Sequence, residues 1–426
     1  MLCFVLSNCS SDAFPTDHVT RSGIISHVSL GLYISVPFCR TKCSYCNFAS
    51  DVFSRAGFER YVERVIADIH HADELAEQLG GLYESAVDSI FLGGGTPTIL
   101  DISQLERLFV AISQTFAVAR DAEITVECAP GTLTPAVLEA FQRCGVNRVS
   151  LGVQSFVDLE AASVGRQHKR ATVLEDLAHL RAAGIENINI DLIAGLPHQS
   201  AESWESSVAE AIATGAPHLS VYMLEVDDDS RLGRELMAGG TKYHAHFVPN
   251  DELTADFYEA ACQRLNAAGV CQYEISNFAR PGKESRHNLK YWTRQPYMGF
   301  GVDAHSMLPR SGKAGEAVRF SSPDSLEQYV SVAPLKKMPV SKSAALEETF
   351  FLGLRLTKGV DLNKVAADFG EPAPRAFTEA ISECVDLGLL ECESDVIRLT
   401  GRGRLLSNEV FERFIQCGSD TPVRRR

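Results

Sequence analysis

Three cysteines, Cys39, Cys43 and Cys46, lie within one short stretch and are the clearest candidates for chemistry in this chain. Thiolates are soft ligands suited to zinc, copper(I) or iron–sulfur clusters, so a tight group of cysteines suggests a metal site. A structural zinc site is closed by four ligands, but the next cysteine is Cys128 and the nearest downstream histidine is His70. Three thiolates on a four-iron cluster would instead leave one iron open to a small molecule.

A predicted strand and loop position these cysteines. Residues 33–36 are an apolar and β-branched run, which predicts a strand. Pro37 then prevents further pairing in a sheet, so the cysteines are expected on the loop that follows.

Strands and helices alternate along the next two hundred residues. Strands are predicted at residues 33–36, 89–92, 123–127, 148–153, 188–193 and 219–224, and helices at 58–79, 103–116, 134–143, 171–183 and 202–213. Such alternation favours a parallel sheet with right-handed crossovers. The fold class is therefore α/β, and six units fit an incomplete TIM-type (β/α)6 barrel. In barrels the chemistry lies on the loops after the carboxyl ends of the strands.

Polar and glycine residues stand at several of these strand ends. The turn containing Gly94, Gly95 and Thr96 has the backbone freedom to approach a ligand closely, although a tight structural turn would use the same residues. It lacks the Lys-Ser/Thr pair of a Walker loop. Glu127 ends the third strand, where a carboxylate could accept hydrogen bonds from a ribose diol or simply face water.

Three more side chains extend this set. Gln154 offers a donor and an acceptor after the fourth strand, and Arg166 has a forked guanidinium suited to a carboxylate. Asp191 interrupts an apolar strand, where a carboxylate is costly unless it is paired or functional.

The ordered motifs VPFCRTKCSYC, FLGGGTPT, LGVQSF, GRQH and IDLIAGLP resemble those of the oxygen-independent coproporphyrinogen III oxidase group of the radical S-adenosylmethionine (SAM) superfamily. The resemblance runs over residues 30–414. It implies a [4Fe–4S] cluster held by Cys39, Cys43 and Cys46, whose open iron binds SAM and whose electron can cleave SAM to a 5′-deoxyadenosyl radical. The SAM-binding residues that it implies are Tyr33, Tyr45, Gly94, Gly95, Thr96, Glu127, Gln154, Arg166 and Asp191.

Two features distinguish the branches of this group, the oxidase and the heme chaperone HemW. The oxidase has a fourth cysteine where this chain has Phe48, which is the chaperone pattern. The stretch from His287 to Trp292 resembles the HNxxYW element of the chaperone branch, and the resemblance implies a part in heme binding. An imidazole can ligate heme iron, and aromatic rings offer flat apolar surface. The same residues could instead only pack over the barrel mouth.

Composition limits the partners. The formal net charge of −15 argues against nucleic acid, because phosphate binding requires clustered Lys and Arg. The remaining cysteines are scattered, as in a reducing compartment, and no run approaches the ~18 apolar residues of a membrane span. We therefore expect a cytoplasmic protein without stable membrane insertion. Residues 1–29 are expected to be a disordered N-terminal extension or the product of an upstream start codon.

The barrel and its extension are predicted to occupy residues 30–307, followed by a Ser-, Pro-, Gly- and Lys-rich linker with loops at 308–342. Residues 343–426 are predicted to form a helical, winged-helix-like C-terminal domain. Its helices are expected at 346–356, 362–369, 374–387 and 403–415, with strands at 389–393 and 396–399. On so acidic a chain, this domain is expected to be a lid or an interaction module.

Three functions stay open. The favoured one is a heme chaperone that holds a SAM-binding cluster, binds heme and transfers it to an acceptor protein. The alternative is an oxygen-independent coproporphyrinogen III oxidase, an enzyme that decarboxylates two propionates of its substrate. The third is a noncatalytic zinc or scaffold protein. An electron donor is expected if SAM is cleaved, and both monomer and dimer are compatible with the sequence.

Overall fold

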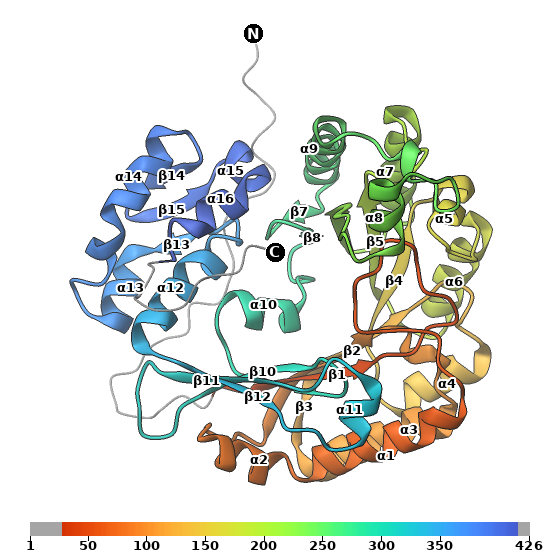
Figure 1. Cartoon of the computed structure of the whole chain (residues 1–426), viewed down its shortest axis with the longest axis horizontal. Coiled ribbons are helices and arrows are strands. Elements are labelled where there is room, and N and C mark those ends of the chain that lie inside the picture. Colours follow the sequence, from red (N-terminus) through yellow and green to blue (C-terminus); the bar gives the residue numbers. More distant parts are fainter. Residues whose placement is uncertain (1–27, 416–426) are drawn as a thin grey trace.

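A computed structural model describes residues 28–415 of the chain, so most of the predicted N-terminal extension lies outside the described residues. Six parallel strands pair in sequence order and curve into an open barrel (Figure 1). They are β1 (Leu30–Val36), β2 (Ala86–Gly94), β3 (Ala117–Cys128), β4 (Arg148–Gln154), β5 (Asn187–Ala194) and β6 (His218–Met223). The predicted α/β fold, an incomplete TIM-type (β/α)6 barrel, is confirmed.

Helices cover the outer face of these strands (Figure 1). They are α1 (Ala56–His70), α2 (Ala72–Leu79), α3 (Ile102–Thr115), α4 (Pro135–Arg143), α5 (Asp158–Ser163), α6 (Arg170–Ala182) and α7 (Ala201–Ala213). The single helix predicted over residues 58–79 is wrong, because His71 leaves the helical conformation and separates α1 from α2. The strands are buried almost throughout: Leu30, Leu32, Ile34 and Val36 of β1 have no exposed surface. Because these strands are buried on both faces, apolar residues run continuously along them instead of alternating with polar residues.

The sheet continues beyond both ends of the barrel to twelve strands. On one side, β8 (Asn277–Ala279) and β7 (Cys271–Gln272) follow β6. On the other, β9 (Tyr297–Phe300) lies parallel to β1, and the antiparallel strands β10 (His305–Pro309), β11 (Ala317–Ser321) and β12 (Lys336–Val340) follow. The helix α11 (Leu326–Val330) connects the last two.

The prediction of a linker and loops over residues 308–342 is therefore wrong where β11 and β12 form. The composition that suggested a linker has another cause. Strand β12 is the last strand on its side of the sheet, and Lys336, Lys337 and Pro339 all lie in it. Lysine and proline are residues that protect an exposed sheet edge from further pairing.

Between β6 and β9 the chain forms α8 (Arg231–Ala238), α9 (Asp251–Ala267) and α10 (Arg286–Trp292). Figure 1 shows α10 within the curve of the sheet, where it partly fills the side that the six strands leave open. No helix in the part of the chain that the structure describes is both long and apolar enough for a membrane span.

The C-terminal region has its own apolar core and its own three-stranded sheet. Its elements are α12 (Lys342–Gly353), β13 (Val360–Asp361), α13 (Leu362–Phe369), α14 (Thr378–Asp386), β14 (Leu390–Glu393), β15 (Val396–Leu399), α15 (Gly401–Leu405) and α16 (Ser407–Glu412). The helices α12, α13 and α14 and the hairpin of β14 and β15 agree with the winged-helix-like prediction, and β13 adds a third strand. The helix predicted at 403–415 is instead two short helices.

A buried ion pair joins this region to the barrel. Glu274, whose side chain has no exposed surface, lies 3.4 Å from Arg355. The Arg355 guanidinium also lies over the Trp292 ring, 4.3 Å from its centroid. Removing one partner of such a pair leaves an uncompensated buried charge, which is strongly destabilising.

We therefore expect Arg355→Ala to lower the free energy of unfolding by about 3 kcal/mol. Arg398→Ala is the matched control, because its partner Glu393 is 82% exposed and exposed pairs contribute about 1 kcal/mol or less. Urea denaturation of the two variants measures the difference. Equal losses would show that the Glu274–Arg355 contact does not hold the two regions together.

Candidate functional site

A cavity of about 380 Å³ opens at the carboxyl ends of the barrel strands. All three cysteines and all nine residues predicted to bind SAM line it: Cys39, Cys43, Cys46, Tyr33, Tyr45, Gly94, Gly95, Thr96, Glu127, Gln154, Arg166 and Asp191. They come from several strands and loops that span more than 150 residues of sequence. The structure thus brings the predicted set together, with the exception of His287 and Trp292, which do not line this cavity.

The cysteine loop is held by backbone hydrogen bonds at both ends. The Cys39 amide donates to the Asp51 carbonyl at 3.0 Å, and the Asp51 amide donates to the Pro37 carbonyl at 3.0 Å. In the middle of the loop, the Ser44 amide donates to the Val164 carbonyl at 3.1 Å. The three thiols are free. No three His, Cys, Asp or Glu side chains within residues 28–415 are grouped so that they could hold one metal ion.

The glycine turn at the end of β2 packs against the start of the cysteine loop. The Thr96 amide donates to the Phe38 carbonyl at 2.8 Å. A Cβ at Gly95 would stand 2.6 Å from the Val36 carbonyl oxygen and 2.7 Å from that of Phe38. No side chain fits in that space, so glycine is required for the cysteine loop to lie on the turn.

Two carboxylates face the cavity from β3 and β5, the strands on either side of β4. Glu127 accepts a hydrogen bond from the Gly94 amide at 3.2 Å. Burial and the nearby Asp191 raise the pKa of Glu127 to about 8. Asp191 accepts hydrogen bonds from Ser150 at 3.2 Å and Asn189 at 2.8 Å, and burial raises its pKa as well. Both carboxylates are therefore poised to gain from a cationic or hydrogen-bonding ligand.

Two buried polar atoms of other cavity residues have no partner among the described residues. The Arg166 Nε and the Gln154 Oε1 make no hydrogen bond to any described residue. Gln154 also has a φ of +69°, a strained conformation that is often found at functional sites. A Cβ at Gly152 would stand 2.8 Å from the Arg166 guanidinium. A bound carboxylate and amino group, such as those of SAM, would fit these unsatisfied groups.

His287 lies deeper than predicted, with 1% of its surface exposed. Its Nδ1 is 3.1 Å from the Ser89 hydroxyl and its Nε2 is 2.8 Å from the Tyr291 hydroxyl. Burial, with Lys290 and Arg148 nearby, lowers the pKa of His287 to about 3, which keeps the ring neutral. Both ring nitrogens are thus engaged, and a bond to heme iron would require one of these hydrogen bonds to break.

Trp292 packs against the C-terminal region instead of the cavity. Its ring lies under Arg355, and its buried Nε1 has no partner among the described residues. The helix that carries His287 and Trp292 is fixed at its start, where Glu123 accepts hydrogen bonds from the Ser285 hydroxyl and the His287 amide. His287 and Trp292 therefore pack inside the fold and join regions, whereas Asn288 and Tyr291 of the same element line cavities.

Some cavity residues were missed from the sequence. Asn189 donates to Ser150, to Asp191 and to Ser220, and so organises the wall around Asp191. Its position two residues before Asp191 places both side chains on one face of β5. That alternation was a usable signal within an otherwise apolar strand. Asn288 also lines the cavity; it belongs to the HNxxYW stretch, of which only His287 and Trp292 were predicted as site residues.

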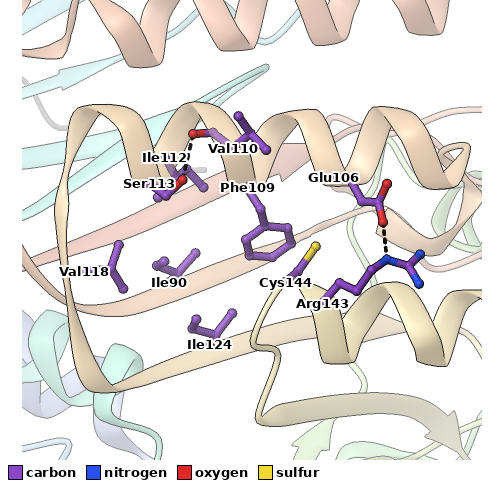
Figure 2. Close-up of a pocket in the computed structure, with 10 residues that line it drawn as sticks. All are labelled: Ile90, Glu106, Phe109, Val110, Ile112, Ser113, Val118, Ile124, Arg143 and Cys144. Atoms are coloured by element: carbon purple, nitrogen blue, oxygen red, sulfur yellow. Dashed lines mark hydrogen bonds and ion pairs between the residues drawn. The ribbon is translucent and has the colours of Figure 1, made fainter.

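A separate pocket of about 360 Å³ lies on the outer side of the barrel (Figure 2). Apolar side chains of α3, β2 and β3 line it, and the ion pair between Glu106 and Arg143, at 2.7 Å, stands at its edge. None of the predicted site residues lines this pocket.

Comparison with known proteins decides the family. Residues 33–211 match the family model of the Radical SAM superfamily, and residues 340–406 match that of the HemN C-terminal domain. The heme chaperone HemW of Bacillus subtilis is 33% identical over 390 residues, which cover 90% of this chain and 98% of that protein. The HemW of Escherichia coli is 30% identical over 91% of this chain and 98% of its own length.

The chain belongs to the heme chaperone HemW family. The radical SAM family implies a [4Fe–4S] cluster and SAM, and the residues around the main cavity have the chemistry to fit both. Among solved structures, the coproporphyrinogen III oxidase HemN of Escherichia coli matches with a TM-score of 0.78 and 24% identity, covering 91% of this chain and 90% of that one. At this identity the match establishes a shared fold.

The raised pKa of Glu127 generates a prediction about stability. The unfolded carboxyl titrates near 4.5, whereas the folded one titrates near 8. As pH rises between these values, the unfolded state loses its proton first, so unfolding becomes easier. In ligand-free protein, Glu127→Gln should therefore become progressively more stable than the wild type from about pH 5 to about pH 8. Urea denaturation across this range tests it, and a pH-independent difference would contradict the burial argument.

Proposed function

We propose that this protein binds heme and transfers it to an acceptor protein, and that it holds a SAM-coordinating [4Fe–4S] cluster. The observation that carries the proposal is the similarity to HemW chaperones over about nine-tenths of the chain and nearly all of theirs. Phe48, in place of the fourth cysteine of the oxidase branch, supports the chaperone assignment.

In this proposal Cys39, Cys43 and Cys46 hold the cluster. The three thiols lie on one loop, whereas Cys128, which also lines the cavity, comes from the end of β3. A cluster held by the three loop thiols alone keeps one position for an exchangeable ligand. When bound, such a cluster can supply an electron to SAM. The Arg166 guanidinium would pair with the carboxylate of SAM, and Glu127 and Asp191 would accept hydrogen bonds from its polar groups. Gly94 and Gly95 would let the backbone approach the methionine part.

Different substitutions should abolish iron binding and weaken SAM binding. Replacing Cys39, Cys43 or Cys46 with Ala should remove most of the iron from anaerobically reconstituted protein. Arg166→Ala is the matched control: it should keep the iron and lose about tenfold to a hundredfold in SAM affinity, since a charge-assisted hydrogen bond contributes about 1.5–3 kcal/mol. Iron analysis and SAM titration measure both. Full iron content in the cysteine variants would refute the ligand assignment.

The alternative is the oxidase reaction, because the fold is close to that of HemN over nine-tenths of both chains. Decarboxylation would require a porphyrinogen propionate to be held inside the barrel beside SAM. A chaperone requires only reversible binding at an accessible surface. The exposed Phe48, with 64% of its surface in solvent at the rim of the cavity, suits the second requirement.

An activity assay should therefore distinguish the two. The reconstituted wild-type protein is expected to bind heme in near-stoichiometric amount and to shift its Soret band. It should form no protoporphyrinogen from coproporphyrinogen III with SAM and a reductant under anaerobic conditions. A bona fide oxidase assayed in parallel is the control. Sustained protoporphyrinogen formation by this protein would favour the oxidase.

The partners follow from the same proposal. They are heme, a heme-acceptor protein and, if SAM is cleaved, an electron donor. The acidic net charge of −15 argues against a nucleic-acid partner. We place the protein in the cytoplasm, as its cysteine usage suggests.

A further inference from the structure

A smaller pocket of about 260 Å³ lies next to the main cavity. Its lining includes Tyr33, Phe48 and Gly94, which also line the main cavity, so the two share a wall. Its other side is formed by Tyr291, Tyr297, and the loop from β9 to β10 with His305 at its end. The pocket therefore combines aromatic surface with one imidazole.

We propose that this pocket is the heme-docking site, with His305 as the ligand of the heme iron and Phe48 as the apolar platform for the macrocycle. The inference rests on the proposed heme-binding function and adds the position and the ligand. It differs from the assignment of His287, whose two ring nitrogens are both occupied.

His305 has the accessibility that a ligand needs. Its side chain is 67% exposed, and neither ring nitrogen has a hydrogen-bond partner among the described residues. The Asp303 carboxylate lies 3.6 Å from Nε2. At this distance, beyond that of a hydrogen bond, both ring nitrogens stay open to a metal ligand bond.

The backbone around His305 is rigid. His305 begins β10 and pairs with Ser321 of β11. The preceding loop is tightly packed, since a Cβ at Gly301 would stand 2.6 Å from the Ser35 carbonyl oxygen. Asp303 has a φ of +53° and is held there by a 2.8 Å hydrogen bond from its amide to the Pro323 carbonyl. A strained, well-supported residue beside an exposed imidazole is typical of a binding site.

The aromatic surface is suited to a flat ligand. The side chain of Phe48 is 64% exposed, although contact between a phenyl ring and water is not favourable. Tyr291 and Tyr297 form the opposite wall, with ring centroids 4.6 Å apart in an edge-to-face pair. Contact with a macrocycle would remove the Phe48 ring from solvent and so stabilise the complex.

A lysine is placed to receive a heme propionate. His305 pairs with Ser321, which pairs in turn with Lys336 of β12, so the three residues form one row across the sheet. Directly paired residues of antiparallel strands point to the same face. With strands about 4.8 Å apart, Lys336 lies about 10 Å from His305, beyond the iron and near the periphery of a bound macrocycle.

The small volume of the pocket suits a ligand that is only partly enclosed and can be passed on. At 260 Å³ it is slightly smaller than the sites that enclose drug-sized ligands, typically about 300–1,000 Å³. A heme would be held by one face and one edge, and the rest would stay open to the acceptor protein. Because Tyr33, Phe48 and Gly94 belong to both cavities, heme would lie directly beside bound SAM.

The test is a titration of cluster-loaded protein with ferric heme, followed by the Soret band and by resonance Raman spectroscopy. His305→Ala and Phe48→Ala should each weaken binding at least tenfold, and Lys336→Glu should weaken it severalfold without disturbing the edge strand. His305→Met should replace the histidine signature of the iron with that of a thioether. The matched control is His179→Ala, which removes an exposed histidine from α6 and should bind like the wild type.

Iron–sulfur content and circular dichroism establish that each variant is folded. Wild-type affinity and an unchanged iron signature in His305→Ala would overturn the site while leaving the chaperone function intact. Loss of heme only in His287→Ala would return the ligand to α10. Absence of heme binding by the wild type would overturn both the site and the proposed function.

Discussion

The contact between the cysteine loop and the glycine turn after β2 is the constraint on which the site depends. Only a glycine at position 95 leaves room for the carbonyls of Val36 and Phe38. The Thr96 amide then fixes the loop through its hydrogen bond to Phe38. Because β1 and β2 are adjacent parallel strands, this contact places the cysteines over the carboxyl ends of the whole barrel. Glu127, Gln154 and Asp191 then reach the cavity from their own strands.

A second constraint is the satisfaction of polar groups inside the barrel. Asp191 is linked through Asn189 and Ser220 to Asn277, whose amide donates to the buried Glu274. Glu274 pairs in turn with Arg355 of the C-terminal region. Buried polar groups are expensive unless each has a partner, so these side chains fix one another in position. The wall of the cavity and the docking of the C-terminal region are therefore parts of one hydrogen-bonded network.

Much of the barrel and of the candidate site could be predicted from the sequence, because cysteine, glycine and charged residues interrupt the apolar pattern at or near the ends of the strands. The cysteines, the glycine turn and the interrupted strand at Asp191 all indicated the same cavity. The outer strands β11 and β12 were missed because lysine and proline are common both in linkers and at exposed sheet edges. Here Lys336 and Pro339 lie in an edge strand. The helix that carries His287 was not predicted, and the surroundings of this residue depend on contacts with Ser89 and Tyr291 that no local pattern reveals.

The position of Phe48 connects the two cavities and favours handover over catalysis. A radical enzyme has to exclude water from its substrate, and enclosure is achieved by burying apolar side chains around it. Here the aromatic side chain between the two cavities points largely into solvent. A cargo bound to an exposed phenyl ring and an exposed imidazole can leave again without the opening of an enclosed site. The shared wall of Tyr33, Phe48 and Gly94 then makes the occupancy of one cavity sensitive to that of the other, because packed walls transmit small shifts.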